Sequence, residues 1–279
     1  MTGATTPAAS GPRAGRRAYG RALAALLLLL APLTARAQDA SRGPYVRVFS
    51  GLGITRPGDL SIRQPALDLG LTFEQVSWAH QSLSTEWTRD SIPYMGARVG
   101  GFPLGVPWLG VSAEVVHFTV RAEADRLVRV TGVVGAAPID LTVPLDQFVQ
   151  RYQVGNGVNL ILGNIQAHRW IGRGTGTSPP RADLYAGVGA GTTVTHTNSV
   201  VNGGSRAQYD LGGFAMQAFA GVAWRLFPRW ELSGEYKLSR TTIDGAVDRG
   251  TSHSRLYTNH VVLGIGLLLS GRDRPGSAR

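Results

Sequence analysis

The chain has 279 residues, a formal net charge of +10 and no cysteine. Without cysteine it has no disulfide framework of the kind on which small secreted domains depend. Its basic residues are dispersed instead of clustering with aromatic side chains, so a nucleic-acid partner is not expected.

Residues 1–37 are predicted to be an export signal. They contain five arginines and no acidic residue, and the apolar stretch 22–33 is followed by an Ala-x-Ala cleavage pattern at 35–37. The apolar stretch is too short to cross a bilayer, and Pro32 interrupts it. Cleavage would remove the five arginines and lower the formal net charge from +10 to +5.

The first half of the remaining chain shows the alternation of a half-buried β-strand, with an apolar residue at every second position. Three strands are predicted, at residues 45–54, 93–102 and 108–120. The long connection 55–92 contains a weaker alternation whose phase slips between Phe73 and Val76. A second long connection covers 121–151.

The second half alternates more strongly. Every second residue from Phe214 to Leu226, and again from Trp230 to Leu238, is apolar or glycine, which predicts a hairpin. Both faces of the fourth strand contain apolar residues and asparagine, so either face could point inward. The five predicted strands cover residues 152–170, 182–196, 214–226, 230–239 and 256–269.

Connections along these eight strands alternate between short and long. Short turns at one end and long loops at the other, with an even number of strands, are typical of an outer-membrane barrel. Four of the six tryptophans flank the short turns, and Tyr94, Tyr152, Tyr209 and Tyr257 begin the strands that leave the long loops. Two aromatic levels match the two membrane interfaces, whereas a soluble ligand-binding barrel would need no such segregation.

We therefore predict an all-β fold: an eight-stranded antiparallel transmembrane β-barrel with long outer loops, in the outer membrane of a Gram-negative cell. Residues 38–270 are expected to form the barrel, and 271–279 a flexible C-terminal tail. Eight strands enclose only enough room for side chains, so a diffusion pore is not expected.

The apolar face of such a barrel meets lipid, and the polar face fills the lumen. Buried charges are costly unless they pair, so we expect a polar network there. Its predicted members are Arg98, Glu114, Asn159, Gln217, Glu235 and Lys237.

Three histidines near the outer end of the strands are the candidate catalytic residues: His117, His196 and His260. They are either solvated rim side chains or parts of a site that acts on outer-leaflet lipid. No metal site is predicted, because no motif has metal-ligand spacing and Glu114 and His117 fall on opposite faces of one strand.

Several short segments resemble one family of small outer-membrane β-barrels, OmpA-like in fold, that includes lipid A oxidase-like proteins. The similar segments are Arg63-Gln64-Pro65, Thr72–Trp78, Pro93-Tyr94 with Gly96 and Arg98, Glu114 with His117, Gly157–Leu160 with Asn164, Tyr185–Gly189, Gly234–Lys237 and Thr258–His260. The resemblance implies oxidation of the proximal glucosamine of lipid A to 2-aminogluconate with oxygen. The chain departs from the family pattern at Asn156, where a histidine is expected, and in continuing beyond Leu269.

Two functions are therefore considered. The first is a non-enzymatic barrel with an envelope-structural or surface-recognition role, in which loops 55–92 and 121–151 form an outer cap. The alternative, implied by the resemblance, is a lipid A oxidase-like enzyme that uses oxygen or a metal; without that activity no cofactor is expected. The expected partners are outer-membrane lipid and lipopolysaccharide, with the barrel-assembly machinery during biogenesis, and the expected state is a monomer.

Overall fold

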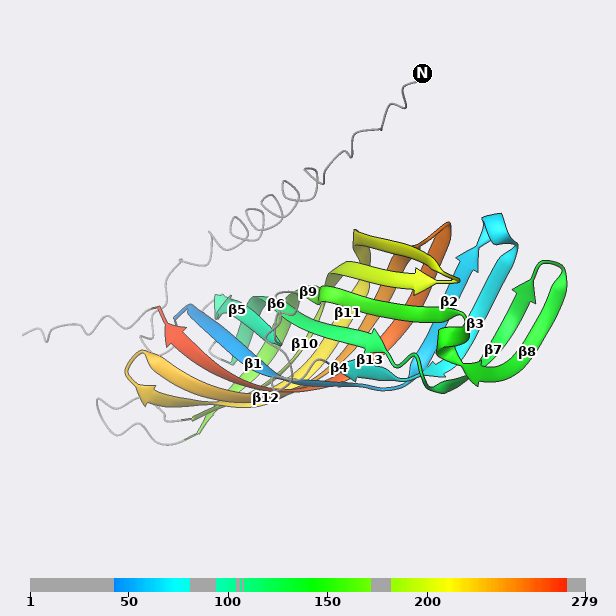
Figure 1. Cartoon of the computed structure of the whole chain (residues 1–279). Helices are drawn as coiled ribbons and strands as arrows, with labels where there is room; N and C mark the ends of the chain where they lie inside the picture. The colour runs from blue at the N-terminus through cyan, green and yellow to red at the C-terminus, as the bar shows by residue number, and fades with distance from the viewer. Residues whose placement is uncertain (1–42, 81–93, 104–105, 107, 172–181, 270–279) are drawn as a thin grey trace, which may run out of the picture. The chain divides into compact units, whose positions relative to one another are not determined.

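The computed structural model describes residues 43–80, 94–103, 106, 108–171 and 182–269 (Figure 1). The predicted export signal and C-terminal tail lie outside these ranges. No helix within them is long and apolar enough to cross a membrane. The helices they contain are the single 3-10 turns Pro65–Leu67 and Leu145–Gln147. The strands are β1 (Tyr45–Thr55), β2 (Gly58–Gln64), β3 (Leu69–Val76), β4 (Trp78–His80), β5 (Met95–Gly101), β6 (Leu109–Ala122), β7 (Leu127–Val134), β8 (Ala137–Pro144), β9 (Val149–Ile171), β10 (Ala182–Val201), β11 (Gly204–Phe227), β12 (Trp230–Val247) and β13 (Gly250–Leu268).

Eight of these strands form a closed ring. Hydrogen bonding follows the order β1-β5-β6-β9-β10-β11-β12-β13. The ring closes because β13 pairs back to β1 over the whole length of β1, from Tyr45 opposite Leu268 to Thr55 opposite Thr258. Every pairing is antiparallel. The predicted all-β, eight-stranded antiparallel barrel is confirmed, with its strands in the predicted order.

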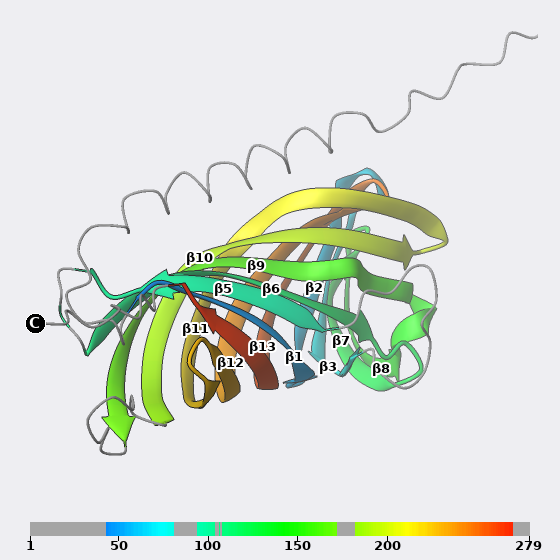
Figure 2. The same cartoon turned by 90° about the vertical axis from the view of Figure 1, so that its left-hand side faces the viewer.

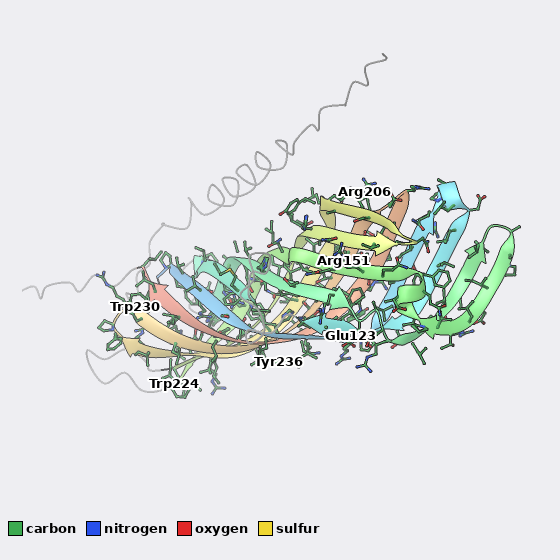
Figure 3. The ribbon with its side chains drawn as sticks, viewed as in Figure 1. Glu123, Arg151, Arg206, Trp224, Trp230 and Tyr236 are labelled. Carbon is green, nitrogen blue, oxygen red and sulfur yellow. The ribbon has the colours of Figure 1, made fainter. Side chains whose placement is uncertain are left out.

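A belt of exposed apolar side chains surrounds the ring. On β13, for example, Val261, Leu263 and Ile265 point outward and are more than half exposed. Trp108, Trp224 and Trp230 are also exposed beside the short turns, and Figure 3 shows Trp224 and Trp230 together at that end. Large apolar side chains facing out on every strand would be unfavourable in water, so the belt is the lipid-facing surface of a transmembrane barrel.

The four predicted girdle tyrosines do not share one environment. Tyr209 and Tyr257 are about half exposed on the outer surface, as expected, but Tyr94 and Tyr152 are buried inside. Tyr152 instead binds the hydroxyl of Ser252 at 3.0 Å. The difference arises because Tyr94 and Tyr152 fall on the inward parity of β5 and β9.

The two connections expected to be outer loops contain strands. β2 pairs with the first residues of β13, and β3, β7 and β8 follow in that order, so the sheet continues beyond the ring (Figures 1 and 2). The phase slip in β3 occurs at Gln75, whose φ of 54° lets Phe73 and Val76 both point inward. The hairpin between β10 and β11 turns at Asn202 and Gly203, whose positive φ angles suit a two-residue turn.

The interior changes from polar to apolar along the same strands. On β12, inward positions in the membrane half carry Glu231, Glu235 and Lys237, whereas Ile243 and Val247 face inward farther out. The outer half therefore has its own apolar core, formed by Leu60, Ile62, Leu71, Phe73, Val130, Leu145, Val149, Val154, Ile243, Val247 and Leu256. Because short turns face the periplasm in barrels of this kind, this half lies outside the cell.

Candidate functional site

The middle of the lumen holds four charges that pair in a closed set, here called the charged quartet. Its members are Arg98 on β5, Glu114 on β6, and Glu235 and Lys237 on β12. Arg98 donates to Glu114 Oε2 at 2.8 Å and to Glu235 Oε2 at 2.7 Å. Lys237 Nζ lies 2.9 Å from Glu235 Oε1 and also donates to Glu114. All four side chains are buried and their formal charges sum to zero.

Glu114 is the centre of this arrangement. Besides Arg98 and Lys237, its carboxylate accepts hydrogen bonds from Asn164 Nδ2 at 3.0 Å and Gln217 Nε2 at 3.1 Å. The amides are joined to each other, since Gln217 donates to Asn164 Oδ1 at 2.8 Å. Glu114 thus ties together β5, β6, β9, β11 and β12.

Aromatic rings cover the two cations. The Arg98 guanidinium lies 4.3 Å from the Phe219 ring centroid, and Lys237 Nζ lies 4.1 Å from that of Phe49. Such contacts partly replace the water that these groups lose on burial. The quartet and its rings therefore fill the lumen as packed, fully partnered groups.

A second polar layer lies nearer the short turns. Arg47 pairs with Glu231, and His168 Nδ1 is 2.7 Å from Asp183 Oδ2. Gln166 donates to the Tyr45 hydroxyl. All of these side chains are buried.

This layer was not predicted from the sequence, and for its β9 members the reason is that either face of the fourth strand could point inward. In the structure Asn164, Gln166 and His168 share the inward face of β9. The available signal was this run of three polar residues two apart, which on a lipid-facing surface would have been unfavourable.

A third layer lies at the junction with the outer apolar core. His260 Nε2 is 2.7 Å from Ser239 Oγ, and the His260 ring packs against Tyr94 and Phe118. His80 Nε2 lies 2.7 Å from Thr55 Oγ1. Both histidines are packed against neighbouring side chains.

The three candidate histidines are not brought together. His260 lies in the lumen, whereas His117 and His196 are on the outward parity of β6 and β10. The His196 ring is 4.3 Å from that of Tyr209. No group of three or more histidine, aspartate or glutamate side chains suited to a metal occurs in the described residues.

Asn159 lies elsewhere than expected. The predicted network placed it in the lumen, but it is on the outward parity of β9, level with His117 and Met95. Its Oδ1 is 2.8 Å from His117 Nδ1, and its Nδ2 donates to the Val194 carbonyl at 3.0 Å. The backbone of Gly157, with φ at 97°, covers the His117 ring. The other five members, Arg98, Glu114, Gln217, Glu235 and Lys237, do meet in the lumen.

Comparison with known proteins finds similar chains among solved structures, at low identity. No protein-family model and no curated protein matches the chain. Among solved structures, the chain is similar to Neisserial surface protein A (9% identity, 81% of this chain and 97% of that chain covered, TM-score 0.36). It is also similar to the outer membrane protease OmpT of Escherichia coli (8%, 84% and 99%, TM-score 0.44). A third is Ail, the attachment invasion locus protein of Yersinia pestis (8%, 79% and 99%, TM-score 0.28).

All three TM-scores are below 0.5, so the class of protein is taken from the structure of this chain. The closed ring and its apolar belt define the class directly: the protein is a transmembrane β-barrel of the outer-membrane type.

Proposed function

We propose that this protein is an outer-membrane barrel without a channel, which has an envelope-structural or surface-recognition role. Its functional surface is then its extracellular half. The observation that carries this proposal is the double closure of the lumen. The charged quartet fills its middle, and the apolar core of the outer half lies above it. A continuous water path through both would need several buried groups to move.

The outer half has features of a rigid recognition surface. The buried side chain of Gln64 joins two hairpin ends, because its Nε2 donates to the Asp248 carbonyl at 2.7 Å and its Oε1 accepts from Asn202 Nδ2 at 2.7 Å. Asn202 also donates through its backbone to the Phe148 carbonyl at 2.9 Å. A surface that is already ordered loses little conformational entropy when it binds.

Several outward positions on this half are charged. Arg151 and Arg206 are exposed there, at the opposite end of the unit from Trp224 and Trp230 (Figure 3). Asp244 and His253 form an exposed pair at 2.6 Å. These side chains offer hydrogen bonds and charge to a partner in solution.

Single-channel recording in planar bilayers tests the closed lumen. Insertion of the purified protein, verified by its resistance to unfolding in cold detergent, should give no stepwise conductance. Regular conductance steps that scale with the number of inserted molecules would contradict the proposal. The Glu114→Ala variant is the comparison, because removal of the central carboxylate should increase leak if the quartet is the barrier.

A second candidate is the lipid A oxidase-like activity. The observation in its favour is His117, which Asn159 orients on the outward parity of β6 and whose Nε2 has no hydrogen-bond partner among the described residues. The test is the lipid A mass profile of a host that expresses the protein, grown with and without oxygen. An oxygen-dependent gain of one oxygen atom, lost in His117→Ala, would establish the activity. An unchanged profile with folded protein in the membrane would exclude it.

A further inference from the structure

A groove of about 520 Å³ lies on the wall of the barrel, where the apolar belt meets the extracellular half. It crosses β10, β11, β12 and β13 and reaches the connection after β1. Two lateral rows of paired residues form it. The upper row is Ala190, Met216, Arg240 and Tyr257, and the lower row is Val188, Ala218, Leu238 and Asn259.

The lower row of the groove forms an apolar, lipid-facing surface. Val188 and Leu238 stand on either side of Ala218, and all three are exposed on the lipid-facing parity. The small side chain of Ala218 between the two larger ones leaves a hollow in this apolar surface. The polar atoms of Asn259 are used within the protein, since Oδ1 accepts from the Tyr236 hydroxyl at 2.7 Å.

The upper rim of the groove carries two arginines. Arg240 on β12 faces outward between Met216 and Tyr257, and its buried Nε has no hydrogen-bond partner among the described residues. Arg56 lies on the far side of Tyr257, where its backbone N–H donates to the Tyr257 carbonyl at 2.9 Å. No carboxylate is among the residues that line the groove. Two cations at the edge of an apolar surface therefore lack an anionic partner from the groove itself.

The hydrogen-bond ladder between β11 and β12 ends just above the groove. Pairing between β11 and β12 ends at Ala215 opposite Thr241, although both strands continue farther out. Farther out the two strands stay in contact without a ladder, since the Ala246 backbone N–H donates to Asp210 Oδ2 at 3.3 Å.

We propose that the groove binds one lipid A molecule of the outer leaflet, with an acyl chain along Ala218 and a phosphate between Arg56 and Arg240. The chemistry of the site carries this choice: an apolar hollow below two arginines suits a ligand with an acyl chain directly beneath a phosphate. Arginine suits that anion because its planar guanidinium can donate two hydrogen bonds to one phosphate. The proposal rests on the orientation of the barrel in the membrane, and it is independent of the recognition role and of the oxidase candidate.

Native mass spectrometry of protein refolded in detergent without lipid tests the proposal. Bisphosphorylated lipid A should bind with one-to-one stoichiometry. Removal of its phosphates, or the double variant Arg56→Gln/Arg240→Gln, should weaken binding ten-fold or more. The charge-matched control is Arg63→Gln/Arg169→Gln, which removes two exposed arginines that do not line the groove and should bind like the wild type. Every variant is first checked for the folded barrel by its gel mobility without heating.

A third variant separates shape from charge. Ala218→Trp fills the hollow on the lipid-facing surface without changing the charge, and it should weaken lipid A binding while leaving the barrel folded. Equal binding of phosphorylated and dephosphorylated lipid A would overturn the proposal. So would unchanged binding in the Arg56→Gln/Arg240→Gln variant, and equal or tighter binding of phosphatidylglycerol would show that the occupant is a phospholipid.

Discussion

At the scale of single residues, Glu114 has the largest structural role in the lumen. Its carboxylate accepts from two cations and two amides, and it is completely buried. A buried ion pair contributes little when compared with a well-packed apolar substitute. Breaking it from one side is costly, because the remaining charge is left unpaired.

We expect Glu114→Gln to lower the free energy of unfolding by about 3–5 kcal/mol, because Arg98 and Lys237 would share one carboxylate. Urea titration of the protein in lipid vesicles measures the loss. Adding Lys237→Met should recover part of it by restoring charge balance. The control is Glu123→Gln, which breaks only a rim pair with Arg126 at 3.5 Å and should cost less than about 1 kcal/mol. Equal effects at the two glutamates would contradict the assigned role.

The exposed pair on the β7–β8 hairpin leads to a prediction about a carboxyl pKa. Arg129 donates to both oxygens of Asp140, at 2.9 and 2.8 Å, and these hydrogen bonds hold the pKa of the Asp140 carboxyl below its ordinary value of 3.8. Because the folded pKa is the lower one, the stabilisation is present above pH 3.8 and is lost as the pH falls through the folded pKa. NMR titration should show the Asp140 pKa rising toward 3.8 in Arg129→Gln. An unchanged pKa would mean that the pair does not persist in solution.

At the scale of elements, the outer half is held together by contacts between hairpins. Gln64 at the end of β2 joins the β10–β11 turn to the β12–β13 turn. Neither hairpin pairs with the other at this level, because β11 and β12 part at Ala215 and Thr241. The Gln64 amide therefore links the two hairpins where the β11–β12 ladder has ended, as does the hydrogen bond from the Ala246 N–H to Asp210 Oδ2 at 3.3 Å.

Replacing Gln64 with alanine should destabilise the outer half locally by about 1–3 kcal/mol, since two partly buried hydrogen bonds, to the Asp248 carbonyl and from the Asn202 amide, are lost. Hydrogen exchange should accelerate in the turns at 202–204 and 248–250, while the membrane strands stay protected. The matched control is Thr251→Ala, an exposed position in the same β12–β13 hairpin. Exchange that is unchanged in the Gln64 variant would show that the two turns are held by other contacts.

At the scale of the whole molecule, one strand passes through two environments. β13 exposes Leu263 within the apolar belt and His253 beyond it, on the same face. Lipid surrounds the first and water the second. The same substitution should therefore have different costs at the two positions.

We expect Leu263→Arg to destabilise the folded barrel by about 2–4 kcal/mol, which is the cost of arginine near the bilayer midplane. His253→Arg, on the same face but outside the membrane, should change the stability by less than about 0.5 kcal/mol. Unfolding in vesicles measures both. Similar costs at the two positions would place the belt outside the membrane.

Much of the barrel could be read from local patterns. A period of two depends only on which neighbours are apolar, so the eight strands, their order and the slip near Gln75 were predictable along the chain. The strong alternation from Phe214 to Leu238 left little choice of face. In the fourth strand both faces contain apolar residues, so its sequence does not show which face points inward. Its pairing with the neighbouring strands places Asn164, Gln166 and His168 inside.

What the chain alone determined is the eight strands of the ring, the closed-barrel class and the inward parity of Arg98, Glu114, Gln217, Glu235 and Lys237. Only the tertiary structure decided which of them touch, because β5, β6 and β12 meet through pairings that span most of the chain. It also decided that Asn159 faces outward with His117, and that the connections 55–92 and 121–151 build an apolar core. The physical reason is that register and closure are set by all the strands together, whereas alternation is a property of each strand by itself.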